Sequence, residues 1–540
     1  MLFKILFKRM INRKRNIEMS IQEYLDKMKE MIDELKAMST ALGLSNTGDE
    51  YKIISELFTY KFLNDKLLYD FANREDKEDS FDEFVDFAGI DTPKMKKEHL
   101  IDNLFQQQNQ ENFHEIFDKA FVEVNEMNKD IYNIETTSGK KKPLFEPLSV
   151  YIRDDGKELE LAKRAINILS KHTFTNIYDG GFDYFSTVFE YLIKDYNKDS
   201  GKYAEYFTPL FAGNIMAEIL YNDTPVSNVS VYDPSAGSGT LLLALANKIG
   251  TDRCSIYSQD ISQKSTQFLR INLILNKLTH SLQNIIEGNT LTKPEHKEGD
   301  ELKKFDFIVS NPPFKMDFSN MIENLKTDKY NRFFAGLPNI PKKDKNGMAV
   351  YETFLQHVIT SLSEKGKAAV VVPTGFATAV SGIPKKIRQE LVDENILQGV
   401  IHMPSNIFAR TGTSVSIIFI DKTKIDDKVM LMDASNLGNK IKLDDGQRTV
   451  LNEDEKIKIM SFFRKRIEEP EFSVVVSNKD IKDNGYVIQA GQYVELNEEI
   501  LEFDIDKRLN ELSTQLKEII KENKELDATL EKIVEEMRGS

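Results

Sequence analysis

"VYDPSAGSGTLLLAL", residues 231–245, reads as the end of a buried strand, a glycine-rich turn and the start of an apolar helix. Gly237 and Gly239 allow a tight turn and a close approach of the backbone to a ligand. A glycine turn alone is weak evidence of a site. In an α/β sheet, however, ligands bind beyond the carboxyl ends of strands that lead into such turns. The stretch therefore predicts ligand contacts from Asp233, Ser235, Ala236, Gly237, Ser238 and Gly239.

Short apolar segments alternate with helix-length segments between about residues 176 and 430. The predicted strands lie within the sequences VSVYDPSAGSG, CSIYSQD, FDFIVSNPP, KAAVVVPTG, LQGVIHMP and VSIIFI. Strands separated by helices form a parallel sheet. A short link joins the last two, 397–403 and 414–420, which predicts an antiparallel hairpin at one edge. The pattern indicates an α/β, Rossmann-like doubly wound sheet with a C-terminal antiparallel hairpin.

An acidic residue ends the second strand of this pattern. Asp260 follows Gln259 and lies about 20 residues beyond the glycine turn, the spacing at which a carboxylate accepts hydrogen bonds from ribose hydroxyls. The turn and the acid together predict a nucleoside site. They do not identify the nucleoside.

The stretch "FDFIVSNPPF", residues 305–314, ends a core strand on a rigid corner. Pro312 cannot donate a hydrogen bond, but its carbonyl accepts, and Asn311 offers a side-chain acceptor. Two convergent acceptors suit an NH₂ group, and Phe314 offers a face on which a planar ring stacks. When such a nitrogen attacks a methyl group it gains positive character, which the acceptors stabilise most strongly in the transition state. The corner predicts a site for an aromatic amine or an amide.

These motifs together resemble those of S-adenosylmethionine-dependent amino-methyltransferases. The segment "AEYFTP", residues 204–209, looks like their additional cofactor motif, and the motif order is similar to that of the DNA adenine-N6 class. The resemblance implies that Asn311, Pro312 and Phe314 hold an adenine flipped out of the duplex. It also implies that S-adenosyl-L-methionine contacts the glycine turn, Asp260 and Glu205, Tyr206, Phe207, Thr208 and Pro209. Asn289 stands where the family usually has Asp, and its amide oxygen is expected to accept from the cofactor's adenine amine.

Three further segments narrow the resemblance to modification (M) subunits of type I restriction-modification systems. They are "ISELFTYKFLNDK" (54–66), "DKYNRFFAGLP" (328–338) with "NGMAVYETFLQH" (346–357), and "GYVIQAGQYVE" (485–495). The resemblance implies double-stranded DNA as substrate, a specificity (S) subunit that delivers it, a second M subunit and a restriction or motor subunit. The expected divisions are a basic extension (1–18), a helical N-terminal domain (19–175), the methyltransferase domain (176–430), a small C-terminal region (431–499) and a coiled-coil tail (500–540).

The tail carries apolar residues spaced alternately by four and three. They are Ile505, Leu509, Leu512, Leu516, Ile519, Leu526, Leu530, Ile533 and Met537, with Asn523 in the same seam. This heptad pattern predicts a helix that packs against another helix, either in a partner or within the chain. We expect the partner to be the specificity subunit.

Composition limits the other possibilities. The net charge of −15 argues against a chain that grips DNA strongly alone, because phosphate binding needs clustered Lys and Arg. One cysteine, Cys254, excludes an internal disulfide and fits a reducing cytoplasm. No apolar run approaches the ~18 residues that span a bilayer, so no membrane association is expected.

The segment 1–18 is either a basic surface helix or a stretch upstream of a start at Met19. Two alternatives stay open: a self-sufficient DNA adenine methyltransferase and a protein glutamine-N5 methyltransferase.

The loop after Phe314 carries Lys315, Lys326, Lys329 and Arg332. It either closes on DNA or is a solvated loop.

Overall fold

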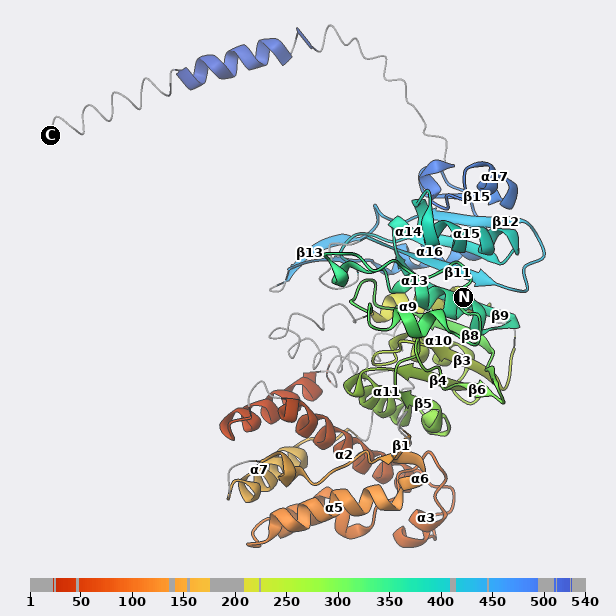
Figure 1. Ribbon diagram of the computed structural model, residues 1–540. Helices are drawn as coiled ribbons and strands as arrows, with labels where there is room; N and C mark the ends of the chain where they lie inside the picture. The colour runs from red at the N-terminus through yellow and green to blue at the C-terminus, as the bar shows by residue number, and fades with distance from the viewer. Residues whose placement is uncertain are drawn as a thin grey trace, which may run out of the picture. The chain divides into compact units, whose positions relative to one another are not determined.

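The computed structural model describes residues 23, 26–44, 48–135, 141–152, 156–174, 208–222, 225–407, 414–443, 446–493, 509–510, 512–524 and 526. The chain divides into two units, Met1–Tyr493 and Val494–Ser540, which are described separately (Figure 1). The basic extension 1–18, Met19, and the cofactor-motif residues Glu205, Tyr206 and Phe207 lie outside the described residues.

The described residues between 26 and 174 are mainly helical. Residues 26–41 form one helix, and the longer elements after it are α2 (Gly48–Ala72), α5 (Phe113–Met127) and α7 (Glu158–Lys171). Apolar residues at helical spacing on α5, such as Phe113, Phe117 and Phe121, are fully buried, which explains why these segments fold as helices. A short antiparallel pair of strands, β1 (Ile134–Glu135) and β2 (Lys141–Lys142), lies between α5 and α7 in the sequence.

A nine-stranded sheet follows, in the order β15-β12-β10-β11-β9-β8-β3-β4-β5. Its strands are β3 (Val229–Asp233), β4 (Cys254–Asp260), β5 (Ile285–Glu287), β8 (Phe305–Ser310), β9 (Leu362–Pro373), β10 (Leu397–His402), β11 (Val415–Asp421), β12 (Lys428–Asp433) and β15 (Ser473–Ser477). Strands β9, β8, β3, β4 and β5 pair in parallel, as predicted for a doubly wound sheet.

The predicted hairpin forms between β10 and β11, but its expected place at one edge is wrong. β11 pairs antiparallel with β9, while β10 pairs in parallel with β12, and β12 pairs with β15. The two outer strands are β12 and β15, both after residue 427, and the sequence pattern did not identify them. The sheet therefore continues past residue 430.

Helices cover both faces of the sheet, and the strands show why. On β3, Val231 packs in one core cluster and Tyr232 in another, because successive side chains of a strand point to opposite faces. The first face holds α9 (Leu210–Leu220), α10 (Thr240–Ile249) and α11 (Gln263–Leu275); the second holds α13 (Tyr351–Ser361) and α15 (Gly382–Asp393) (Figure 1). This arrangement brings the carboxyl ends of β3, β4 and β8 to a common edge.

In the second unit, residues 509–510, 512–524 and 526 are helical. Leu509, Leu512, Leu516, Ile519 and Leu526 of the predicted seam are 48–59% exposed. Ile505, Leu530, Ile533 and Met537 lie outside the described residues. Among the helices of the described segments, none is both long and apolar enough to cross a membrane.

Candidate cofactor and substrate site

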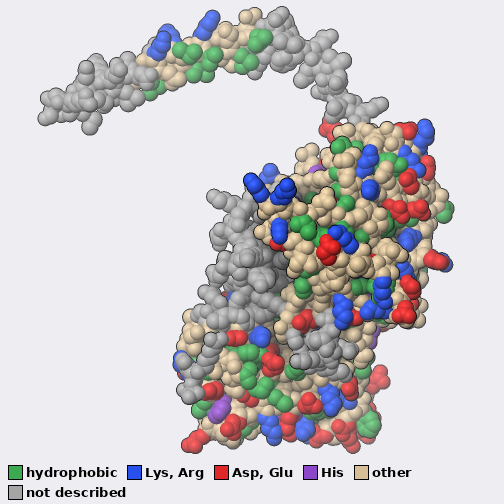
Figure 2. Space-filling view, in the orientation of Figure 1, with side chains coloured by type: hydrophobic (Ala, Val, Ile, Leu, Met, Phe, Trp, Pro, Cys, Tyr) green, Lys and Arg blue, Asp and Glu red, His purple; other side chains and the backbone are tan. Residues whose placement is uncertain are grey.

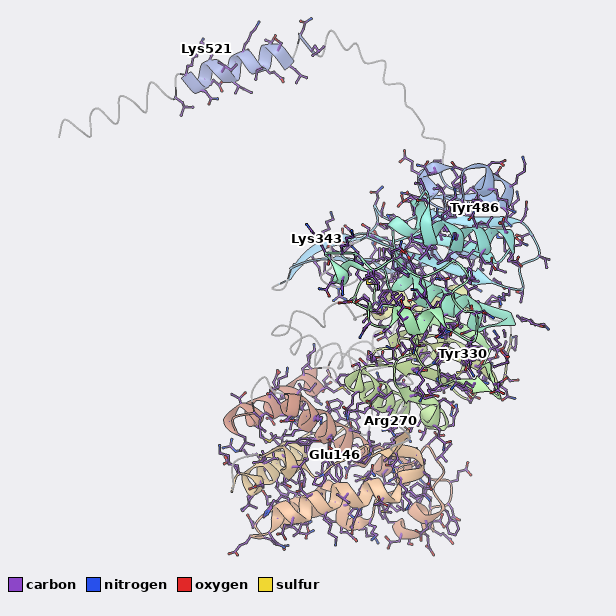
Figure 3. The ribbon with its side chains drawn as sticks, viewed as in Figure 1. Glu146, Arg270, Tyr330, Lys343, Tyr486 and Lys521 are labelled. Atoms are coloured by element: carbon purple, nitrogen blue, oxygen red, sulfur yellow. The ribbon has the colours of Figure 1, made fainter. Side chains whose placement is uncertain are left out.

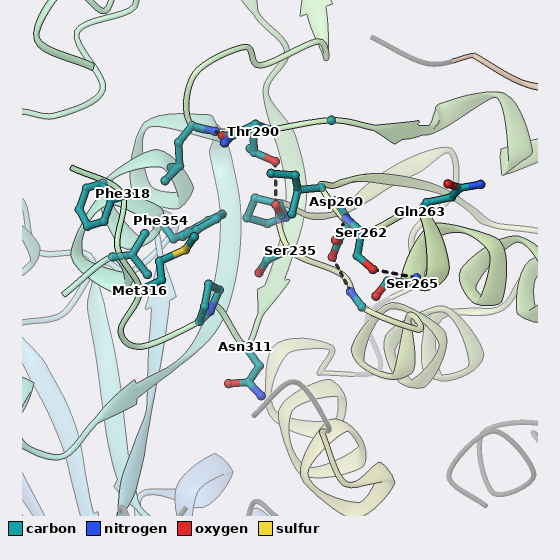
Figure 4. A pocket seen from close by; sticks show the side chains of 18 of the residues that line it. Ser235, Asp260, Ser262, Gln263, Ser265, Thr290, Asn311, Met316, Phe318 and Phe354 are labelled. Carbon is teal, nitrogen blue, oxygen red and sulfur yellow. Dashed lines mark hydrogen bonds between the residues drawn. The ribbon is translucent and has the colours of Figure 1, made fainter. Parts of the chain in front are cut away.

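A cavity of about 530 Å³ opens at the carboxyl ends of the central strands. Its volume lies in the range of about 300–1,000 Å³ that small-molecule sites occupy. The segments after β3, β4, β5 and β8 all contribute to its lining, as the sheet topology predicts. Figure 4 shows two unlike walls, with Met316, Phe318 and Phe354 on one side and Asp260, Ser262 and Ser265 on the other.

Asp233 anchors the glycine turn rather than facing the cavity. Its Oδ1 atom accepts hydrogen bonds from the Ser235 backbone N–H and the Ser310 hydroxyl, both at 2.9 Å. The side chain is buried, so loss of hydration, together with the negative charge of Asp260, raises the pKa of Asp233 to about 7. Asp233 thus fixes the ends of β3 and β8 relative to each other.

The two glycines of the turn adopt backbone conformations that favour glycine. Gly237 has φ of 55° and Gly239 has φ of 87°. A β-carbon on Gly239 would lie 2.2 Å from Leu269 Cδ1, so the turn packs directly on α11. The requirement for glycine predicted from the sequence therefore has two causes, the left-handed backbone and the close approach of a helix.

Asp260 joins the glycine turn to the segment after β4. Its Oδ2 accepts from the Gly237 N–H at 3.0 Å, and its Oδ1 accepts from the Ser262 N–H at 2.8 Å. Although the side chain borders the cavity, removal from bulk water raises its pKa. Each oxygen retains a lone pair, so Asp260 can still accept from a ligand hydroxyl.

Asn289 follows β5 and lines the same cavity. Its Oδ1 accepts from the N–H groups of Leu291 and Thr292 at 3.0 and 3.1 Å, and its Nδ2 lies 3.3 Å from Met321 Sδ. Because an amide nitrogen cannot accept from backbone N–H groups, this arrangement fixes the orientation of the side chain. The polar atom left to face a ligand is therefore the Nδ2 donor, whereas the expected contact used the oxygen.

Arg332 does not face solvent, in contrast to both interpretations of its loop. The side chain is buried, pairs with Asp328 at 2.7 Å, and donates to the backbone oxygens of Thr290 and Leu291 at 3.0 and 2.6 Å. It therefore holds the segment that follows Asn289. In the same loop, Lys326 pairs with Glu323, and Lys329 lies over the ring of Tyr330.

The corner after β8 places Asn311 and Pro313 on the cavity, while Pro312 is buried. The Asn311 Nδ2 atom donates to the Thr208 hydroxyl at 3.0 Å, which directs the remaining acceptor, Oδ1, away from that contact. Phe314 is half-buried, and its ring meets Tyr351 edge-on with centroids 6.4 Å apart. Thr208 is buried, and Pro209 precedes the first residue of α9.

Of the predicted site residues, the structure brings Ser235, Gly237, Ser238, Asp260, Asn289 and Asn311 to the cavity wall. Asp233, Ala236, Gly239, Thr208, Pro209, Pro312 and Phe314 support or adjoin it without lining it. Sequence reasoning missed the apolar wall and the start of α11, where Ser262, Gln263 and Ser265 line the cavity. A signal existed for α11, because Ser262 caps the helix by accepting from the Ser265 N–H.

The cavity fits a nucleoside that carries a polar arm. A carboxylate stands where ribose hydroxyls would need an acceptor, the glycine turn leaves room for close backbone approach, and the apolar wall suits a planar base. The Asn311 corner opens into the same cavity, which places an amine-accepting group beside the nucleoside site.

Comparison with known proteins agrees with this geometry. A family model described as N-6 DNA Methylase matches residues 181–501. The chain is 25% identical to the type I restriction enzyme MpnII methylase subunit of Mycoplasma pneumoniae, over 98% of each chain. It is 23% identical to the MjaVIII methylase subunit of Methanocaldococcus jannaschii, over 92% of this chain and 83% of that one. Its fold matches the type I restriction-modification methyltransferase subunit of Streptococcus thermophilus with a TM-score of 0.66 and 20% identity, covering 87% of this chain and 99% of that one.

Proposed function

Since the chain belongs to the N-6 DNA methylase family, we propose that it methylates adenine N6 in DNA as the modification subunit of a type I restriction-modification system. The family membership confirms the resemblance drawn from the motifs. S-adenosylmethionine supplies the methyl group when it is bound. The observation that carries the proposal is the shared cavity, in which the Asn311 corner and the Asp260 wall face one space.

Different residues in and around the cavity bind different parts of the cofactor and the target adenine. Asp260 holds the ribose, and the segment Ser235–Gly239 surrounds the methionine and the ribose. Asn289 contacts the base, and the segment Glu205–Pro209 also contacts the cofactor. Asn311 Oδ1 and the Pro312 carbonyl accept from the amino group of a flipped adenine, and Phe314 stacks on its ring. The nitrogen would gain positive charge as its bond to the methyl carbon forms and the bond from that carbon to the donor's sulfonium sulfur breaks, leaving a neutral thioether. The acceptors would stabilise this charge until the nitrogen loses a proton to solvent.

Asn311 is positioned for this role by its amide nitrogen. That nitrogen donates to the Thr208 hydroxyl at 3.0 Å, so the amide oxygen points away from this contact and can accept from a ligand. The oxygen is thereby set in advance, which is what transition-state stabilisation requires.

The C-terminal helix supports dependence on a partner. Leu512, Leu516 and Ile519 are about half exposed, and an apolar seam of this length needs another helix to bury it. The net charge of −15 gives the chain little capacity to neutralise phosphates by itself. The seam therefore packs on helices of a specificity subunit, in a coiled coil, and the complex includes a second modification subunit and a restriction or motor subunit.

The test is methyl transfer from labelled S-adenosylmethionine to duplex DNA, by the chain alone and in complex with its specificity subunit. N6-methyladenine should form at specific sites only with the complex. Label on glutamine of a release factor, and none on DNA, would replace the proposal with protein methylation. Site-specific transfer at full rate by the isolated chain would indicate a self-sufficient methyltransferase.

Replacement of Leu512 and Leu526 with Asp tests the tail separately. Each aspartate would put an unpaired charge in the seam, so the complex should fail to form while cofactor binding is retained. The matched control is Lys517→Asp with Lys524→Asp, which changes charge at helix positions outside the predicted seam. Equal assembly of the two double variants would remove the tail from the interface.

A further inference from the structure

A second hollow lies next to the cofactor cavity, on the substrate side. This groove, of about 460 Å³, is lined by two loops and a helix start, including Gly336, Pro338, Asn339, Ala349, Ile383 and Lys386. The start of α13 separates it from the cavity: Val350 and Phe354 face the cavity, whereas Ala349 and Glu352 face the groove. Tyr351, between them, contacts Phe314. The groove is therefore within one helical turn of the proposed adenine site.

Lys386 lines this groove, and further lysines follow closely in sequence on the segments that line it. Lys342, Lys343 and Lys345 are exposed in the loop before α13, and Lys385 and Lys386 lie in the first turn of α15. Figure 3 shows Lys343 projecting from the periphery of this unit, and Figure 2 shows several Lys and Arg side chains grouped in the same region. The net charge of the chain is −15, so a local group of lysines differs from the overall acidic composition.

Most of these lysines form no ion pair with a described residue. Among the described residues, no carboxylate lies within ion-pair distance of Lys342, Lys343, Lys385 or Lys386, in contrast to Lys326, which pairs with Glu323 at 2.7 Å. The acids nearby are otherwise engaged. Asp344 accepts from the Gly347 N–H at 3.1 Å, and Asp317 accepts from the Ser319 N–H at 3.0 Å and also faces Lys345.

Glu352 is the acidic residue that lines the groove. Its side chain is buried, and loss of hydration raises its pKa to about 7, so the carboxyl is partly protonated near neutral pH. The groove thus carries less negative charge than its composition indicates.

We propose that this lysine-rimmed groove binds the sugar-phosphate backbone of the target strand beside the flipped adenine. The inference rests on the proposed DNA substrate. A flipped nucleotide stays covalently attached to the phosphates on either side, so those phosphates must pass close to the Phe314 corner. The groove is the neighbouring hollow, and its uncommitted lysines supply the counter-charge that phosphates require.

The experiment uses the complex with the specificity subunit and the variant Lys342→Ala/Lys343→Ala/Lys386→Ala. Affinity for duplex DNA is measured at several salt concentrations. Each phosphate contact contributes about 0.9 to the slope of log K against log salt, so three lost contacts should reduce the slope by about 2–3. Affinity near 0.15 M salt should fall roughly 10-fold or more, with cofactor affinity unchanged.

The matched control is Lys277→Ala/Lys365→Ala/Lys465→Ala, which removes three exposed lysines outside the groove. An unchanged slope in the groove variant, in a complex that methylates DNA normally, would overturn the groove proposal alone. Loss of assembly with the specificity subunit would overturn it too, because the groove would then be a protein interface. Failure of the parent complex to methylate DNA would instead overturn the proposed function.

Discussion

The two halves of the cavity are built differently. On the cofactor half, the segments after β3, β4 and β5 are hydrogen-bonded to one another. The Gly237 N–H donates to the Asp260 carboxylate, and the Gly288 N–H donates to the Asp260 backbone carbonyl. The Thr290 hydroxyl donates to the Pro234 carbonyl at 2.8 Å. On the target half, the Asn311 side chain donates a hydrogen bond to the Thr208 hydroxyl, and the Phe314 ring meets the Tyr351 ring edge-on; these are the side-chain hydrogen bond and ring contact found for them among the described residues.

This difference indicates that the chain preorganises one half by its own contacts and leaves the other to be completed by the substrate. Asp260 and Asn289 already satisfy backbone donors, so changes there should alter both cofactor affinity and the stability of the loops. The Asn311 oxygen makes no hydrogen bond within the described residues, and Phe314 adjoins the cavity, so changes at these two positions should alter the rate of transfer. Four variants test that division.

Asn311→Ala should have the largest effect. It removes an acceptor whose value is greatest in the transition state, so kcat should fall by about 10²–10³-fold, by analogy with the loss of an oxyanion-hole donor. Cofactor affinity should stay within a few-fold. Single-turnover transfer to DNA measures the first quantity and calorimetry the second. Asn324→Ala, at an exposed helical position, is the matched control. Normal transfer by Asn311→Ala would exclude the corner as the reaction site.

Asp260→Ala should act mainly on cofactor binding. It removes an acceptor for ribose, and a hydrogen bond to a charged group contributes about 1.5–3 kcal/mol. It also leaves the N–H groups of Gly237 and Ser262 without their partner, so the thermal midpoint should fall as well. Asp260→Asn keeps one acceptor oxygen and should fall between the parent and Asp260→Ala. If calorimetry gives the same affinity for all three, Asp260 does not contact the cofactor.

Much of the cofactor half could be predicted from sequence because its signals are local. The strand, glycine turn and helix of 231–245 are contiguous, and the acid at the end of the second strand follows from the regular spacing of the fold. The parallel order of the central strands likewise follows from alternation with helices. The role of Asp233 in tying β3 to β8 could not be predicted, because Ser310 is 77 residues away in sequence.

The apolar wall of the cavity, the support of the segment after Asn289 and the outer strands of the sheet were harder to predict, because their contacts join distant segments. Met316, Phe318 and Phe354 form one wall although nothing in their spacing relates them. Arg332 resembles a surface cation in sequence, yet Asp328 four residues earlier and two backbone carbonyls keep it buried. The outer strands β12 and β15 were missed for the same reason, since their pairing is set by the sheet edge and not by local pattern.

Asp233→Asn tests the cost of the buried acid on the cofactor half. The folded-state pKa of about 7 exceeds the unfolded value of about 3.9. Below about pH 4 the carboxyl is protonated in both states; between about 4 and 7 only the folded state keeps the proton, so the stability of the parent falls as pH rises. The slope is at most about 1.4 kcal/mol per pH unit. The variant amide does not titrate at this position and can still accept from Ser235 and Ser310.

The thermal midpoint of Asp233→Asn should therefore rise relative to the parent between pH 4 and 7, and the difference should level off above pH 7. Asp260 is present in both proteins, but its negative charge is one cause of the raised pKa of Asp233, so the difference reports on both carboxyls. A difference that is independent of pH would mean that Asp233 is ionised in the folded protein throughout.

Asn289→Asp should have the smallest effect, in the direction of tighter binding. In the parent, Asn289 Oδ1 is held by two backbone N–H groups, so the amide presents its Nδ2 donor to the cavity. The 6-amino group of adenine is also a donor, and two donors cannot bond. Aspartate keeps the two backbone bonds with one oxygen and offers the other as an acceptor, which should strengthen cofactor binding by about 0.5–1.5 kcal/mol.

The inosine analogue of S-adenosylhomocysteine carries an oxygen in place of the amine. The Nδ2 group of the parent can donate to this oxygen, whereas the aspartate cannot. Calorimetry with both ligands should therefore show the preference for the amino form increasing from parent to variant. A variant that binds S-adenosylhomocysteine no more tightly, and discriminates no better against the inosine form, would show that Asn289 does not face the 6-position and that its departure from the family residue is neutral.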